Sequence, residues 1–325
     1  MTQVTQMTGT ADRVVLVSSR RKDPGLAEVV EELGTAGPVA LLTAGWQEWE
    51  EDDEALRSAL GREVVNLRLW HRAEEVWRED PELAAGHREV QSRVRLLRQA
   101  YNLRLAHAMD AWIHLEALPG ENEVLDGERG SALEAVRRLD REHAARLREF
   151  RRAYHQRFDP LVRDAVARQR CEIADALEDA GLLVVAGGHV AVILNRIRLF
   201  GLDRLLEGKA VLATGAGAMA LGQQVVLFHD SPPWGPGHAE VGEVGPGLYS
   251  GVVPLPEPDV RLRLDDPGRV SRMARRFAPD SCLLLEPGTR AEWRGGWTTS
   301  DARRLGPVGR PEAWDGRTPP SLEAS

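Results

Sequence analysis

Short apolar runs alternate with amphipathic stretches in the first eighty residues of the chain. The runs consist mostly of valine and leucine, which is typical of parallel strands buried on both faces of a sheet. The stretches between them carry charged residues on one side and predict helices. Alternating strands and helices predict a parallel sheet covered by helices on both faces. The strands are expected at 14–17, 39–42 and 64–69, and the helices at 24–33, with Asp23 as its cap, and at 54–60.

The middle of the chain has a different pattern, with apolar residues at every third or fourth position. Such a stripe runs from about residue 81 to 118 and a second one from 133 to 158. This spacing predicts two long amphipathic helices. Ser131 and Glu134 form a possible capping box for the second helix, and Pro160 breaks it before helix resumes towards residue 180. The two stripes predict an antiparallel helical hairpin inserted into the α/β domain.

The last third of the chain returns to alternating strands and helices, and then becomes rich in proline, glycine, arginine and serine. This final composition has few apolar residues and predicts a disordered tail. Strands are expected at 182–185, 210–212, 225–228, 252–253 and 282–285, with helices at 190–207 and 269–277.

These elements predict an α/β protein with three layers, a mostly parallel flavodoxin-like sheet and a long inserted helical hairpin. The expected divisions of the chain are a disordered N-terminus (1–12), the first part of the α/β domain (13–80), the inserted helical region (81–180), the second part of the α/β domain (181–305) and a disordered tail (306–325).

The composition is that of an ordinary soluble protein, with 42% hydrophobic and 28% charged residues among 325. A collagenous, wholly disordered or disulfide-scaffold protein is excluded on these grounds. The net charge of −8 argues against binding to nucleic acid, because contacts with phosphates need a basic surface. The only two cysteines, Cys171 and Cys282, lie far apart in the sequence, which favours free thiols in a reducing compartment.

The sequence favours a cytoplasmic location. Residues 1–13 are polar and lack the apolar centre of a signal peptide. The most apolar later stretch, 210–221, is too short for a membrane span and is interrupted by Gly215 and Gly217. We therefore expect no contact with a membrane.

Two glycine-rich segments follow predicted strands and are candidates for a ligand site. They are Gly187-Gly188-His189 and the run from Thr214 to Ala218. Ligands of open α/β sheets bind outside the carboxyl ends of the strands. The second segment does not match a dinucleotide-binding loop, because Ala220 stands at the third glycine position. We expect no cofactor.

The histidines of the inserted helices do not predict a metal site. No two of them have the spacing of three or four residues that would place both on one helical face. They are expected to be surface or packing residues. These histidines are His87, His107, His114, His143 and His155.

The segment from Leu182 to Gly222 resembles the dipeptidase E and cyanophycinase-like serine peptidases, which have a class I glutamine amidotransferase-like fold. In that family a strand ends in Gly-Gly-Asn, and after a helix the next strand ends in Gly-x-Ser-Ala-Gly-Ala, with serine as the nucleophile. The resemblance extends more loosely to the first βαβ units and to residues 248–286. It implies the same fold here, with backbone N–H groups of Gly188 and Ala216 where the family binds an oxyanion.

The chain departs from the family pattern at the residues that carry the chemistry. Gly215 stands in the place of the nucleophile and has no side chain, and His189 replaces the asparagine. Glu257 lies about where the family has its histidine, and Glu286 about where it has its acid. Covalent catalysis needs all three groups within hydrogen-bond reach, so catalysis is expected to be lost. The expected ligand-binding residues are Gly187, Gly188, His189, Gly215 and Ala216; their glycines also fit a purely structural role in tight turns.

Three functional hypotheses remain open. In the first, the protein is a peptidase-like pseudoenzyme that binds a small anionic or peptide-like ligand, or another protein. In the second, it is a hydrolase with another nucleophile or an activated water, and His189, Glu240 or Glu257 is the base. In the third, the helical hairpin is the functional part and forms a homodimer or binds a protein partner. The absence of the serine favours the first and the third.

Overall fold

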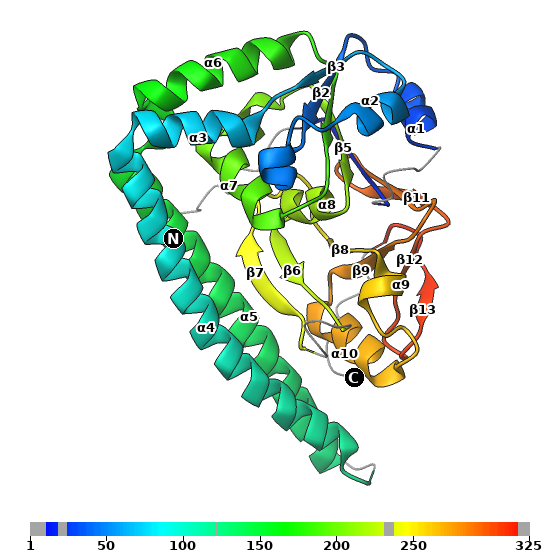
Figure 1. Ribbon diagram of the computed structural model, residues 1–325. Coiled ribbons are helices and arrows are strands. Elements are labelled where there is room, and N and C mark those ends of the chain that lie inside the picture. Colours follow the sequence, from blue (N-terminus) through cyan, green and yellow to red (C-terminus); the bar gives the residue numbers. More distant parts are fainter. Residues whose placement is uncertain (1–10, 19–24, 121–122, 231–236, 318–325) are drawn as a thin grey trace.

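The computed structural model describes residues 11–18, 25–120, 123–230 and 237–317 (Figure 1). Of the expected disordered N-terminus, only Ala11 and Asp12 are described. Ala11 forms an isolated antiparallel bridge with Glu207, so the prediction of disorder is wrong for this residue. Residues 1–10 and 318–325 lie outside the described part of the chain.

The centre of the molecule is a seven-stranded sheet in the order β11-β10-β1-β5-β4-β2-β3. Strands β1, β5, β4, β2 and β3 are parallel to one another. Strands β10 and β11 are antiparallel and extend the sheet beyond β1. Their bounds are β1 (Arg13–Val17), β2 (Val39–Leu42), β3 (Val64–Asn66), β4 (Leu182–Val185), β5 (Ala210–Thr214), β10 (Arg290–Trp293) and β11 (Trp297–Ser300).

Alternation along the strands separates the two faces of this sheet. In β1, Val15 and Val17 pack on the face covered by α1 (Leu26–Glu32) and α2 (Glu54–Leu60). Val14 and Leu16 of the same strand pack on the opposite face, in the larger core. The helices that contribute to that core are α3 (Leu69–Glu79), α6 (Asp164–Glu178), α7 (Val190–Phe200) and α8 (Ala216–Leu221). The predicted three-layer α/β fold with a mostly parallel sheet is confirmed.

A second sheet, in the order β13-β12-β9-β8, lies beside the first, and a separate ribbon joins β6 to β7. The bounds are β6 (Gln224–Leu227), β7 (Glu240–Val244), β8 (Val252–Pro256), β9 (Ser281–Leu285), β12 (Arg303–Leu305) and β13 (Pro311–Ala313), with α9 (Pro258–Arg261) and α10 (Pro267–Phe277) near them.

The predicted disordered tail is wrong for residues 306–317. Strand β13 pairs with β12, and Trp314 is 4% exposed with its ring 5.8 Å from that of Trp297. A single tryptophan buries a large apolar area, and backbone pairing needs no apolar side chains. The low apolar content of this segment therefore did not preclude order.

The inserted hairpin consists of α4 (Pro81–Ala117) and α5 (Glu123–Phe158), which lie side by side along one flank of the molecule (Figure 1). The predicted insertion is confirmed. Helix α5 begins eight residues before Ser131, so the predicted capping box is wrong. A Cβ on Gly127 or Gly130 would meet no atom within 4 Å, which shows that these glycines face open space inside the helix.

Three other predicted boundaries are corrected. Strand β3 ends at Asn66 and α3, which was not predicted, begins at Leu69. The helix expected at 190–207 ends at Phe200, because Gly201 adopts a left-handed conformation with φ 56° that terminates it. Helix α6, within the expected insertion, packs on the α/β body and not along the hairpin.

A buried polar cluster attaches the hairpin to the body. The Tyr101 hydroxyl on α4 donates a hydrogen bond to Asp140 Oδ1 on α5 at 2.7 Å and accepts one from the backbone N–H of Val241 on β7 at 3.1 Å. Arg276 on α10 donates to both carboxylate oxygens of Asp140, at 2.8 and 2.7 Å. Asp140 and Arg276 are 8% and 4% exposed, so each charge depends on the other for compensation.

The substitution Arg276→Leu should lower the free energy of unfolding by about 3–5 kcal/mol, because it leaves the buried Asp140 carboxylate without its cation. Urea denaturation measures the loss. The control is Arg141→Leu, which removes an exposed pair with Glu134 and should change stability by less than about 1 kcal/mol. Equal effects of the two substitutions would contradict the role given to the cluster.

The expected homodimer or partner contact through the hairpin stays a prediction. Leu96 and Leu103 lie on one outer face of α4, two helical turns apart, and are 67% and 65% exposed. We expect the wild-type protein to self-associate at high micromolar concentration and Leu96→Asp/Leu103→Asp to be monomeric, as measured by light scattering. A strictly monomeric wild-type protein would contradict self-association.

Candidate functional site

Three turns at the carboxyl edge of the central sheet meet with direct backbone contact. They follow β2, β4 and β5. A Cβ on Gly45 would lie 2.7 Å from the Gly187 carbonyl oxygen, and a Cβ on Gly188 would lie 2.5 Å from that of Gly45. A Cβ on Gly217 would lie 2.4 Å from the carbonyl oxygen of Val185. No side chain fits at any of these positions, so glycine is required by the close approach of the turns.

Gly215 occupies the sharp turn between β5 and α8. Its φ of 55° and ψ of −125° form a conformation that is costly for residues with a Cβ. A Cβ on Gly187 would lie 3.7 Å from the Gly215 Cα and 3.3 Å from the Ala216 nitrogen, so the two predicted glycine motifs are neighbours. Gln47 has nearly the same angles, φ 60° and ψ −126°, in the turn Ala44–Trp49 (η1) after β2.

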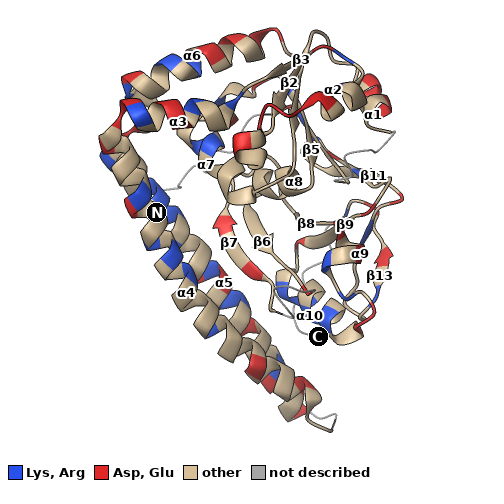
Figure 2. Ribbon diagram, in the orientation of Figure 1, with Lys and Arg blue, Asp and Glu red and all other residues tan. Residues whose placement is uncertain are grey.

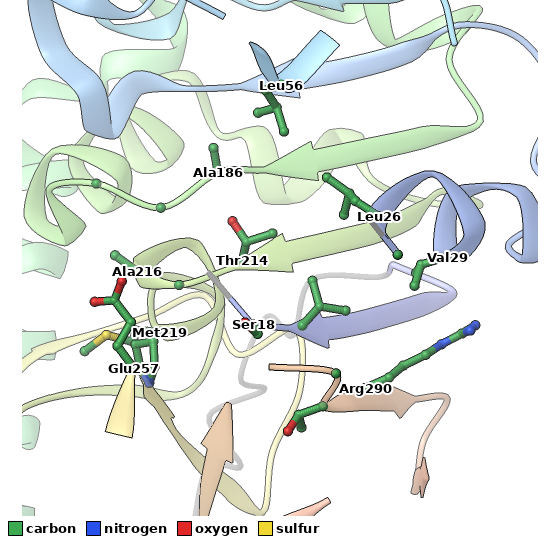
Figure 3. Close-up of a pocket in the computed structure, with 18 of the residues that line it drawn as sticks. Ser18, Leu26, Val29, Leu56, Ala186, Thr214, Ala216, Met219, Glu257 and Arg290 are labelled. Carbon is green, nitrogen blue, oxygen red and sulfur yellow. The ribbon is translucent and has the colours of Figure 1, made fainter. Parts of the chain in front are cut away.

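A cavity of about 610 Å³ lies outside these strand ends. Figure 3 shows β4, β5 and β1 ending side by side at Ala186, Thr214 and Ser18, which form its floor. Because Val17 pairs with Thr214, Ser18 follows at the position beside Gly215. Ser18 is 5% exposed. Apolar walls come from α1, α2 and α8, and include Leu26, Val29, Leu56 and Met219.

The charged residues that line this cavity in the described part of the chain are mostly acidic. Two arginines, Arg261 and Arg290, face it, and both form ion pairs. Arg261 Nη2 lies 2.8 Å from Glu257 Oε2, and Arg290 contacts Glu32. The carboxylates are Glu28, Glu32, Asp52 and Glu257.

Most of the predicted site residues lie together. Gly187, Gly188, Gly215, Ala216 and Glu257 all line the cavity, and Figure 3 places the Glu257 carboxylate next to Ala216. The expectation that they bind a ligand stays a prediction. The family resemblance pointed to Glu257 as a site residue. Glu257 directly follows β8, and the carboxyl end of that strand lies on the same side of the molecule as the cavity.

The other predicted residues lie elsewhere. His189 caps the start of α7 and is exposed, but it does not line the cavity. Glu286 follows β9 and pairs with Arg303 at 3.1 Å. Glu240 is on β7 and contacts Arg98 of the hairpin. None of these three residues is placed to act on a ligand in the cavity.

Sequence reasoning missed several residues that line the cavity. Ser18, Asp52 and Thr289 come from loops, and Arg290 comes from β10, and none of these segments carries a motif. The position of Ser18 directly after the first apolar run was a usable indication, because the carboxyl ends of neighbouring parallel strands meet.

Hydroxyl groups are present at Ser18 and Thr214, but no histidine lines the cavity in the described part of the chain. A hydroxyl nucleophile needs an adjacent base, and Glu257 already pairs with Arg261. The arrangement offers polar backbone groups and acidic side chains on an apolar surface.

No family model matches this chain, and no curated protein matches its sequence. A solved structure described as a peptidase from an acI-B1 Actinobacterium is similar to it in fold. The similarity covers 95% of this chain and 99% of the other, with a TM-score of 0.46 and 14% sequence identity. These values are too low to transfer an activity.

Within 11–18, 25–120, 123–230 and 237–317, no three His, Cys, Asp or Glu side chains are grouped closely enough to hold a metal ion. Among the helices described, none combines the length and apolarity needed to cross a membrane.

The close contact of the turns predicts a specific cost for Gly217→Ala. The new Cβ would overlap the carbonyl oxygens of Val185 and Ala186, so unfolding free energy should fall by about 1–3 kcal/mol. Gly127→Ala is the matched control, since that glycine is also helical but faces open space, and it should be stabilising by about 0.5–1 kcal/mol. Thermal or urea unfolding measures both. A neutral effect of Gly217→Ala would contradict the described packing.

Proposed function

We propose that the protein is a serine-peptidase-like binding module without covalent catalysis, and that its cavity binds a small peptide-like ligand. The observation that carries the proposal is Gly215. It stands in the sharp strand-to-helix turn that the family resemblance gives to the nucleophile, and it has no side chain. The cavity at this turn is nevertheless open and of ligand size.

The lining of the cavity supports a peptide-like ligand over a purely anionic one. Backbone N–H groups of Gly188 and Ala216 border it on one side and can donate to a carbonyl oxygen. Glu28 and Asp52 border it as well and form no ion pair with the described residues. A peptide-like molecule offers both a carbonyl oxygen and amide or amino donors for such groups. The apolar walls would accommodate its side chains.

The alternative of a hydrolase with another nucleophile is not supported by the cavity. Thr214 is one residue away from the nucleophile position, and the groups named as possible bases are either outside the cavity or paired with arginine. The third hypothesis, a role for the hairpin as an interaction surface, is compatible with the binding proposal and depends on the self-association experiment above.

The wild-type protein should not be labelled by a fluorophosphonate serine probe, because the position that would react has no oxygen. Gly215→Ser should also remain unlabelled or react far more slowly than an active serine peptidase, since loss of the histidine of a triad alone costs on the order of 10⁶ in turnover. Labelling is read by mass spectrometry. Rapid labelling of the wild-type protein that Thr214→Ala abolishes would overturn the pseudoenzyme proposal.

Binding is tested by a thermal-shift screen with amino-acid amides and N-acetylated dipeptide amides. A compound that binds should raise the melting temperature, and Val29→Trp should reduce that rise by narrowing the cavity with a bulky side chain. Val162→Trp is the control, because Val162 is 69% exposed and lies outside the cavity. If no compound stabilises the protein, or if Val29→Trp leaves the rise unchanged, the cavity does not bind peptide-like ligands.

A further inference from the structure

A second, much smaller cavity lies at the base of the hairpin, where α4 and α5 meet α7. Its volume of about 20 Å³ is enough for one particle slightly larger than a water molecule. It is separate from the cavity at the strand ends and shares none of its lining residues. The polar residues that line it are His87, Arg151, Tyr154, His155, Asn195 and Arg198.

The two arginines in this wall share a single carboxylate. Arg151 contacts Glu243 Oε2, and Arg198 Nη1 lies 3.3 Å from the same oxygen. The other oxygen, Oε1, accepts a hydrogen bond from the backbone N–H of Val244 at 3.0 Å. All three side chains are largely buried, with exposed fractions of 11%, 19% and 10% for Arg151, Arg198 and Glu243. One buried positive charge is therefore left over in this group.

Donors in the same wall also lack acceptors. Arg151 Nε and the Tyr154 hydroxyl are buried and have no hydrogen-bond partner within the described chain. Arg151 is 9% exposed as a whole residue, so water from outside does not solvate it freely. Buried donors in native proteins are almost always paired with protein groups or with a bound species. Arg151 Nε and the Tyr154 hydroxyl therefore lack a hydrogen-bond acceptor in the described chain.

The surrounding groups make the local field positive. Burial is the main cause that lowers the pKa of His87 to about 3, and the cations Arg196 and Arg151 lower it further. Burial also lowers the pKa of Arg198, to about 10, so this residue keeps its charge at neutral pH. Asp159 and Asp203 do not line the cavity, although Asp203 attracts Arg198 and Asp159 attracts His155. Burial raises the pKa of Asp203, because it disfavours the charged form of that carboxyl group.

We propose that this cavity binds one small monovalent anion of the size of chloride, held by Arg151, Arg198 and the hydroxyl of Tyr154. The anion would accept hydrogen bonds from the orphaned donors and compensate the extra guanidinium charge. A water molecule could do the first but not the second. Because the ligands come from α5 and α7, the bound anion would fix the hairpin to the α/β body.

An anion that binds the folded protein alone stabilises it by mass action, and the effect saturates as the site fills. The test is the melting temperature of the full chain in increasing sodium chloride, with sodium gluconate added to keep ionic strength constant, since gluconate is too large for the cavity. We expect a saturating rise of about 2 °C or more. The same titration with bromide should behave alike, and a crystal soaked in bromide should show an anomalous peak between Arg151 and Tyr154.

Two substitutions separate this site from general salt effects. Tyr154→Phe removes one donor and should move the chloride midpoint several-fold higher. Tyr101→Phe is the matched control: it removes another buried tyrosine hydroxyl outside this cavity, and should lower stability without moving the midpoint. The absence of a chloride effect at constant ionic strength, the absence of a bromide peak, or a midpoint unchanged by Tyr154→Phe would each overturn the proposal.

Discussion

The candidate site depends on three turns that approach each other more closely than any side chain allows. Gly45, Gly188 and Gly217 each face a backbone carbonyl at a distance where a Cβ would overlap it. This packing brings the ends of β2, β4 and β5 together and fixes where Gly215 and Ala216 lie. The cavity lies outside these turns, and residues of helices α1 and α2 line it as well. A glycine requirement of this kind is structural, and it positions the cavity whether or not the protein acts on its ligand.

The hairpin is held by charges rather than by apolar packing alone. Asp140 receives Arg276 from α10 and Tyr101 from α4, and Glu243 receives Arg151 and Arg198. Outside these clusters the hairpin alternates acidic and basic residues along its exposed length (Figure 2). Buried ion pairs contribute little net stability compared with apolar residues, but losing one partner is costly. Such pairs therefore define how the hairpin sits on the body more than they increase its total stability.

The parts of the fold that follow from periodicity could be predicted, and those that rest on long-range pairing could not. The apolar run Val14–Val17 predicts a strand, and the apolar stripes of α4 and α5 predict helices, because in each case the spacing of neighbouring residues is enough to identify the element. Strands β10 and β11 contain Arg290, Glu292 and two threonines, and they form because β1 offers an open edge. The two glycine motifs in the sequence were enough to predict one side of the cavity. Ser18 and Arg290 were missed, since only the register of β1 with β5 and β10 brings them there.

The backbone conformation of Gly215 is one that a residue with a Cβ adopts only at a cost. A serine at position 215 would have to adopt φ near 55°, and conformations of this kind cost residues with a Cβ about 1–3 kcal/mol. An enzyme accepts that cost because it exposes the nucleophile. Here glycine removes both the oxygen and the strain. Gln47, in the neighbouring turn after β2, has almost the same backbone angles as Gly215 although it carries a Cβ. The residue before it, Trp46, lines the cavity. Since strain persists only where the surrounding structure holds it in place, the shape of this turn is maintained although no nucleophile is present.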